Sequence, residues 1–120
     1  MSQLLSLQEV HNLAMNITGE ELQKEGYEFL AINSDLKKNP QFVAIKNKET
    51  VFVVVRSVNS AKGTKNFQNK LMLPIIKQAK KYNARVFYAG IWLGHGKNIN
   101  QPIINGEEYS FIYEGLIEVT

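Results

Sequence analysis

The first part of the chain has apolar residues at helical spacing. Ser6 and Glu9 form the S-x-x-E pattern of a helix capping box, so we expect a helix to begin near Leu7. Apolar side chains then repeat at intervals of three and four residues, at Val10, Leu13, Ala14 and Ile17. His11 lies on the same helix without a partner at a telling spacing, and we expect a boundary or surface histidine there.

A second capping pattern, Thr18-x-x-Glu21, lies inside this helical stretch. It predicts that the helix breaks or kinks at Thr18–Gly19 and then restarts. Gly26 is the expected C-terminal stop, because glycine readily adopts the left-handed conformation that ends many helices.

Three runs with strand character follow, at Tyr27–Asn33, Gln41–Lys46 and Thr50–Ser57. The third run, TVFVVVRS, is β-branched and nearly all apolar, which is typical of a central strand buried on both faces. Because short polar loops separate the three runs, we expect an antiparallel meander.

The second half of the chain predicts a helix, a buried strand and a β extension. Apolar residues recur every three or four positions, at Phe67, Leu71, Ile75, Ala79 and Tyr82. Pro74 lies inside this pattern, so either the helix kinks there or it starts near Leu73. Ala84–Leu93 is typical of a buried strand, a loop is expected over residues 94–100, and Tyr109–Val119 should add one or two strands at the sheet edge.

This order of elements predicts a single α/β domain, bordering on α+β, over residues 1–120. A helical crossover after the meander leads to a parallel strand, so the sheet should be mixed and covered by helices in three layers. We expect the core at about residues 6–93 and the C-terminal β extension at about residues 101–119.

The composition excludes several kinds of site. The chain has no cysteine, which rules out disulfides and Cys-ligated zinc or iron–sulfur centres, and its two histidines cannot form a three-His zinc site. We expect no cofactor. No apolar run reaches the roughly 18 residues of a membrane span, and the N-terminus lacks the basic start of a secretory signal. We therefore expect a cytoplasmic protein that makes no membrane contact.

The net charge of +3 is unevenly distributed, with −4 over residues 1–34, +11 over residues 35–97 and −4 over residues 98–120. A basic centre is a candidate surface for nucleic acid or another polyanion. The residues expected to contact a polyanion are Lys46, Arg56, Lys62, Lys65 and Lys70. The alternative is a solvated lysine-rich surface spread over several faces, because only two of the fourteen basic residues are arginines.

Two short segments carry a resemblance to a known family. Residues 39–41 (NPQ) are similar to a Pro-Asp at the start of a second strand, and residues 52–56 (FVVVR) are similar to F-V-E-V-K in a third strand. Together with the helix–β–β–β–helix–β order, they resemble the restriction-endonuclease-like nucleases of the PD-(D/E)XK superfamily, especially its small resolvase-like members. Gln41 and Val54 are 13 positions apart, which suits this superfamily. The C-terminal extension has no counterpart in it.

The resemblance implies a metal site whose ligands this chain has lost. In these nucleases an Asp and a Glu hold a divalent metal, and a Lys helps position or activate the attacking water. The matching positions here are Gln41, Val54 and Arg56, and the first-helix acid of some members would be Glu20 or Glu21. Gln offers one neutral oxygen, Val offers none, and Arg stays protonated. We therefore expect a degenerate active site with no metal and no catalytic residue.

Three functions are weighed. The first is a non-catalytic nuclease-fold protein that binds nucleic acid or another polyanion through Arg56 and the central lysines. The second is an active metal-dependent nuclease with displaced ligands, Glu20 or Glu21 among them. The third is a homodimer or protein-interaction module that uses the C-terminal strands. Arg56 is expected either to reach an acidic ligand or to pair with one of the two helix glutamates.

Overall fold

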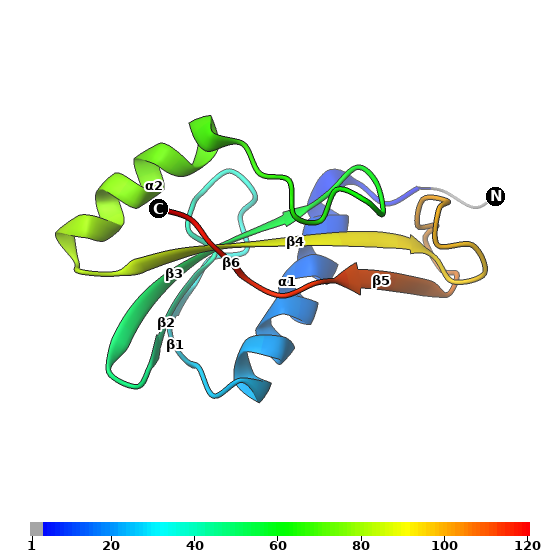
Figure 1. Ribbon diagram of the computed structural model, residues 1–120. Coiled ribbons are helices and arrows are strands. Elements are labelled where there is room, and N and C mark those ends of the chain that lie inside the picture. The colour runs from blue at the N-terminus through cyan, green and yellow to red at the C-terminus, as the bar shows by residue number, and fades with distance from the viewer. Residues whose placement is uncertain (1–3) are drawn as a thin grey trace.

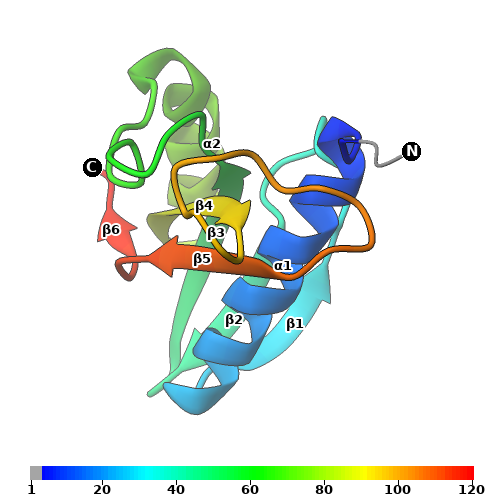
Figure 2. The same ribbon diagram turned by 90° about the vertical axis from the view of Figure 1, so that its right-hand side faces the viewer.

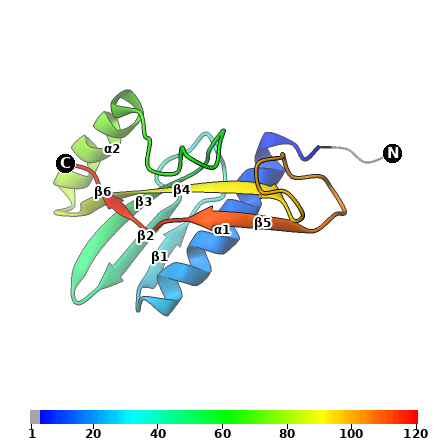
Figure 3. The same cartoon turned by 45° about the vertical axis from the view of Figure 1, so that its right-hand side comes forward.

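The first helix is followed by three strands, a second helix and a fourth strand, in the predicted order (Figure 1). The computed structural model describes residues 4–120, so the first three residues of the expected domain lie outside the described range. The elements are α1 (Leu7–Lys24), β1 (Glu28–Ile32), β2 (Phe42–Lys46), β3 (Glu49–Ser57), α2 (Asn69–Lys81), β4 (Arg85–His95), β5 (Tyr109–Tyr113) and β6 (Ile117–Glu118). Figure 3 shows the sheet between α1 and α2, and the protein is a three-layer α/β domain.

One six-stranded mixed sheet runs through the molecule in the order β1-β2-β3-β4-β5. The first three strands are antiparallel neighbours, and β3 and β4 are parallel, which confirms the expected meander and crossover. The C-terminal strands β5 and β6 both pair antiparallel with β4, β5 along residues 91–95 and β6 along residues 87–88. The predicted extension therefore completes the sheet along β4.

Helix α1 begins as predicted and does not break. The Ser6 hydroxyl accepts a hydrogen bond from the Glu9 amide at 3.1 Å, and the Glu9 carboxylate accepts one from the Ser6 amide at 2.8 Å. The predicted kink at Thr18–Gly19 is wrong, because the helix runs without interruption through both residues. A Cβ on Gly19 would lie 3.5 Å from the Phe42 ring, an ordinary van der Waals contact, so the helix packs directly on the sheet at this point.

Helix α2 and strand β4 also differ in detail from the sequence prediction. The helix begins at Asn69 with Pro74 inside it, so the second of the two alternatives, a start near Leu73, is wrong. The missing N–H of Pro74 costs the hydrogen bond that the Lys70 carbonyl would otherwise accept. Strand β4 continues to His95, two residues beyond the predicted end, because residues 91–95 pair with β5.

The core lies on both faces of β3, as its apolar sequence predicts. Val51, Val53 and Val55 are buried in the cluster that contains the α1 side chains, and Phe52 and Val54 are buried in the cluster that contains those of α2. This alternation follows from the two-residue period of a strand.

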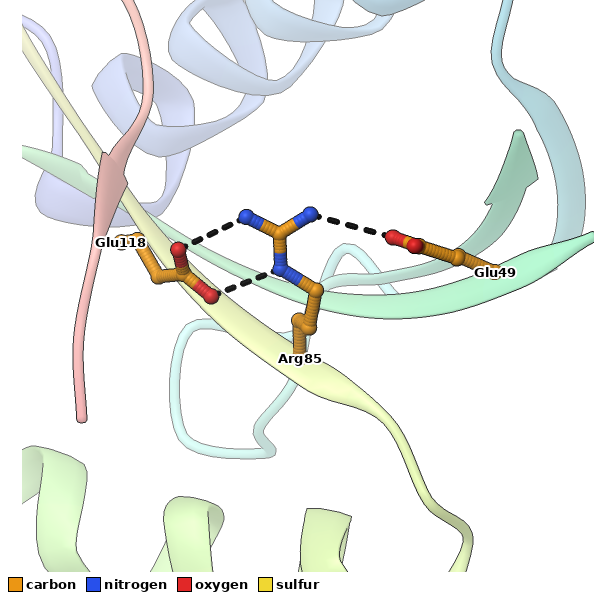
Figure 4. A network of polar contacts seen from close by, with 3 residues as sticks. All are labelled: Glu49, Arg85 and Glu118. Atoms are coloured by element: carbon orange, nitrogen blue, oxygen red, sulfur yellow. Dashed lines mark hydrogen bonds and ion pairs between the residues drawn. The ribbon is translucent and has the colours of Figure 1, made fainter. Parts of the chain in front are cut away.

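An exposed ion-pair network joins β6 to the start of β3 and β4 (Figure 4). The Arg85 guanidinium donates to both carboxylate oxygens of Glu118, each at 2.7 Å, and to Glu49 at 3.0 Å. Two parallel bonds fix the orientation of the guanidinium as well as its position. The last strand is thereby held against the sheet, next to the Val119 amide that donates to the Val86 carbonyl.

Candidate nucleic-acid interface

Gln41 is a buried structural residue at the entry to β2. Its side-chain oxygen accepts hydrogen bonds from the Val55 amide at 2.8 Å and from Arg56 Nη1 at 3.2 Å. Its nitrogen donates to the Lys38 carbonyl and to Asn39 Oδ1, both at 2.9 Å. The carboxamide thus joins the β1–β2 loop to β3, a task that needs a donor and an acceptor on one side chain.

Arg56 is held by neutral partners only. Its Nη1 also donates to the Val55 carbonyl at 2.7 Å, and its Nη2 donates to Asn39 Oδ1 at 2.6 Å. No carboxylate in residues 4–120 forms an ion pair with it, so the expected pairing with a helix glutamate is wrong. Burial lowers the pKa of the Arg56 guanidinium, yet arginine stays protonated. A half-buried positive charge without a negative partner is therefore available to a ligand.

The structure brings together only some of the residues that the sequence comparison grouped. Gln41 and Arg56 are in contact, whereas Val54 is fully buried in the core beneath α2. His11 is the α1 residue on which the charge of Arg56 acts. Glu20 lies nine residues beyond His11, which is about 14 Å farther along a helix that rises 1.5 Å per residue. Glu21 pairs with Lys24 at 3.5 Å.

Glu21 belongs to a different environment, next to Tyr113. Burial, together with the nearby charges of Glu25 and Glu21, raises the pKa of the Tyr113 hydroxyl to about 12. The two helix glutamates therefore do not join Gln41 and Arg56 in a common site.

Sequence reasoning missed His11, which is fully buried and not at the surface. Neither ring nitrogen has a hydrogen-bond partner among residues 4–120. Burial lowers the pKa of His11, the charge of Arg56 lowers it further, and Asp35 opposes them. One turn earlier on α1, the Gln8 side chain donates to the Ser34 carbonyl at 2.8 Å, so this part of the helix contacts the loop that contains Asp35. The sequence signal for this placement is the i, i+3, i+4 relation of His11 to the apolar residues Ala14 and Met15.

A cavity of about 470 Å³, called here the crevice, opens where β3 ends. Arg56 and Tyr88 line it from the parallel strands β3 and β4, and Phe67, Gln68 and Leu71 line it from the start of α2. None of its lining residues is acidic. The crevice lies at the carboxyl end of β3, and in open α/β sheets ligands bind near the carboxyl ends of parallel strands.

Tyr88 is the unusual side chain of the crevice. It is only 3% exposed, and its hydroxyl makes no hydrogen bond with any residue that the structure describes. Burial raises the pKa of this hydroxyl, and the charge of Arg56 lowers it, which indicates that the two groups lie near each other. An unpartnered phenol beside an unpaired guanidinium is a combination that suits an anion.

The start of α2 adds to the positive potential of the crevice. No side chain caps the helix, and its first turn contains no acid. The N-terminal amides of a helix carry partial positive charge and attract anions. Lys62 and Lys65, in the loop before the helix, and Lys70, in its first turn, are exposed on the same segment.

The loop that contains Lys62 and Lys65 packs against β4. Thr64 is buried, its hydroxyl hydrogen-bonds to Glu114, and its carbonyl oxygen would lie 2.2 Å from a Cβ on Gly90. Only glycine allows this approach. Lys46, by contrast, lies at the opposite end of β3 with its ammonium 5.1 Å from the Tyr27 ring centre, so it does not belong to the crevice.

The family of the protein follows from a match over nearly its whole length. Residues 8–119 match the family model described as Domain of unknown function (DUF8840). The chain belongs to the DUF8840 family. No curated protein matches it. The DUF8840 match extends from α1 to β6, so the C-terminal strands are part of the family domain.

Two further features of the DUF8840 domain concern metal sites and membrane spans. Within residues 4–120, no cluster of three or more His, Asp or Glu side chains has an arrangement that could hold a metal ion. Neither helix in this range combines the length and apolar character that crossing a bilayer requires.

Proposed function

We propose that this DUF8840 protein is a non-catalytic relative of the restriction-endonuclease-like nucleases and binds nucleic acid at the crevice. The observation that carries the proposal is Arg56. Its guanidinium lines a cavity without any acidic residue, and all its hydrogen-bond partners are neutral. A phosphate would supply the negative charge that the protein does not.

The size and walls of the crevice favour a nucleotide unit over a bare inorganic anion. A volume of about 470 Å³ is in the range of small-molecule sites, which is roughly 300–1,000 Å³. Phe67 and Leu71 form an apolar wall, and the Phe67 ring centre lies 5.5 Å from that of Tyr88. Aromatic side chains next to a basic groove are typical of single-strand binding, where bases stack on them.

Three observations support the kinship with a nuclease whose metal site was lost. The helix–β–β–β–helix–β order and the mixed sheet agree with the resemblance. Gln41 and Arg56, at two of the motif positions, touch each other. The Gln41 side chain makes five hydrogen bonds within the protein, and Val54, at the third motif position, is enclosed in the core.

Fluorescence anisotropy with labelled single-stranded and duplex oligonucleotides tests the proposal. We expect binding at 50 mM salt that weakens steeply by 200 mM. The double variant Lys62→Ala/Lys65→Ala should weaken binding. It should also make the slope of log K against log salt concentration shallower by about 1.5. Lys46→Ala/Lys48→Ala removes the same charge about 26 Å away along β3 and should leave binding unchanged. Equal losses in both double variants would mean that binding follows net charge alone.

A plasmid-nicking assay with Mg²⁺ or Mn²⁺ tests the non-catalytic part of the proposal. We expect no nicking. Metal-dependent nicking by the wild-type protein that disappears in Glu20→Ala or Glu21→Ala would establish an active nuclease in its place.

Protein interaction through the C-terminal strands is a second candidate function. Strand β5 is a terminal strand of the sheet, and its Tyr109 and Phe111 side chains are 45% and 46% exposed. Exposed aromatic residues on an edge strand are typical of a protein-binding surface. Phe111→Lys, which should not affect oligonucleotide binding, would abolish capture of such a partner.

A further inference from the structure

Strand β1 is an edge strand of the sheet, and its pairing with β2 shifts register between Phe29 and Ala31, which leaves Leu30 as a bulge. It is the terminal strand next to β2, and no strand within residues 4–120 pairs with its outer side (Figure 2). Leu30 and Ile32 are 59% and 58% exposed on it. The strand, EFLAI, contains no lysine and no proline, which are two of the features that protect sheet edges from pairing, and its one charged residue, Glu28, is at its first position.

An apolar groove borders this edge on each face of the sheet. On the α2 side, a groove of about 440 Å³ is lined by Leu30, Val43 and Phe52. On the α1 side, a groove of about 370 Å³ is lined by Phe29 and Ile32, together with other side chains. Successive side chains of an added strand point to opposite faces, so one extended strand would fill both grooves.

Charges at the two ends of β1 indicate which strand fits. The residues at its start, 25–28, carry a net charge of −2 from Glu25 and from Glu28, the first residue of the strand. The residues that follow it, 33–38, carry a net charge of +1, with Lys37 and Lys38 exposed. When β1 pairs antiparallel with β1 of a second copy, the acidic start of each strand lies near the basic end of the other. Two-fold symmetry repeats this match, whereas a parallel pairing would place like charges together.

We propose that two copies of this chain associate antiparallel through β1, joining their sheets into one. The bulge places Leu30 and Ile32 on opposite faces of the sheet, and the two-fold axis is perpendicular to the sheet, so Leu30 of each copy extends the α2-side groove and Ile32 the α1-side groove. The crevice shares no lining residue with either groove, so this inference stands independently of nucleic-acid binding. In the dimer both crevices face the same side of the joined sheet.

Light scattering of the full chain over a range of concentrations tests this inference. We expect the mass to reach twice 13.6 kDa and to fall to 13.6 kDa in Leu30→Lys. Leu73→Lys, at a 63% exposed position on α2, and Phe111→Lys, on β5, should keep the doubled mass. A wild-type mass of 13.6 kDa at every concentration would overturn the inference. Loss of the doubled mass in Phe111→Lys but not in Leu30→Lys would overturn it in favour of the C-terminal strands.

Hydrogen–deuterium exchange of the wild-type protein supplies a test that does not depend on a variant folding. As the concentration rises, amides in residues 28–32 should gain protection, and amides of β5 should not. Exchange in β1 that is independent of concentration, over the range where the mass doubles, would contradict pairing through this strand.

Discussion

Gln41 Oε1 accepts a hydrogen bond from Arg56 Nη1 over 3.2 Å, and this contact explains why the guanidinium remains available to a ligand. A carboxylate at position 41 would neutralise the charge of Arg56. The carboxamide orients the guanidinium without neutralising it. Under the proposed nuclease kinship, glutamine in place of the motif aspartate removes a metal ligand and leaves the positive charge of Arg56 for phosphate binding.

Gln41→Ala should lower the free energy of unfolding by about 1–3 kcal/mol, because the buried Val55 amide loses its acceptor. Urea denaturation measures the change. Gln78→Ala, at an exposed position on α2, is the control and should stay within about 0.5 kcal/mol of the wild type. Equal stabilities of the two variants would show that the Gln41 network contributes nothing.

Tyr88→Phe should weaken oligonucleotide binding about tenfold and leave the free energy of unfolding unchanged within about 0.5 kcal/mol. The reason is that the hydroxyl has no hydrogen-bond partner in the described protein but lines the crevice beside Arg56. Tyr82→Phe, at a 64% exposed position outside the crevice, is the matched control. Unchanged affinity in Tyr88→Phe would exclude the phenol from the binding site.

Stability should fall as the pH drops below about 6.5, the usual pKa of histidine, and part of this loss should come from His11. Burial and the charge of Arg56 lower the pKa of His11 in the folded state. The unfolded chain therefore binds a proton before the folded protein does, and protonation favours unfolding as the pH falls toward the folded-state pKa. His11→Leu should show a shallower loss between pH 7 and pH 5 in thermal denaturation, and identical profiles would contradict this assignment.

Arg85→Ala should loosen β6 without unfolding the sheet. Both oxygens of Glu118 lose their donors, so the amides of residues 117–119 should exchange faster with deuterium (Figure 4). Glu118→Gln should have a larger effect than Glu49→Gln, because Glu118 accepts two hydrogen bonds and Glu49 one. The reverse order would show that the bidentate pair does not hold the strand.

Regular patterns predicted most of the fold correctly. The Ser6 capping box, the buried β3 and the parallel crossover depend on local chemistry and on strand periodicity, both of which the sequence contains. The predicted kink at Thr18–Gly19 failed because packing of the helix against the sheet outweighed a local capping pattern.

The environment of the site was harder to predict. His11 and Thr18 are polar, so an apolar pattern misses them, although both are fully buried on the sheet-facing side of α1. The separation of Glu20 and Glu21 from Arg56 depends on where α1 lies along the sheet, which spacing in the sequence does not determine. The apolar strand pattern predicts an ordinary core residue at Tyr88. It does not predict the crevice that Tyr88 lines, because residues far apart in the sequence form that crevice.

A titration of the ¹⁵N-labelled protein with a short single-stranded oligonucleotide, followed by amide chemical shifts, tests the central claim most directly. We predict that the shifts that move lie at Arg56, in the loop over residues 58–66, at Tyr88 and in the first turn of α2. Amides of the hairpin around Lys46–Glu49, at the opposite end of β3, should stay in place. Shifts confined to that hairpin or to β5, or no shifts at low salt, would contradict nucleic-acid binding at the crevice.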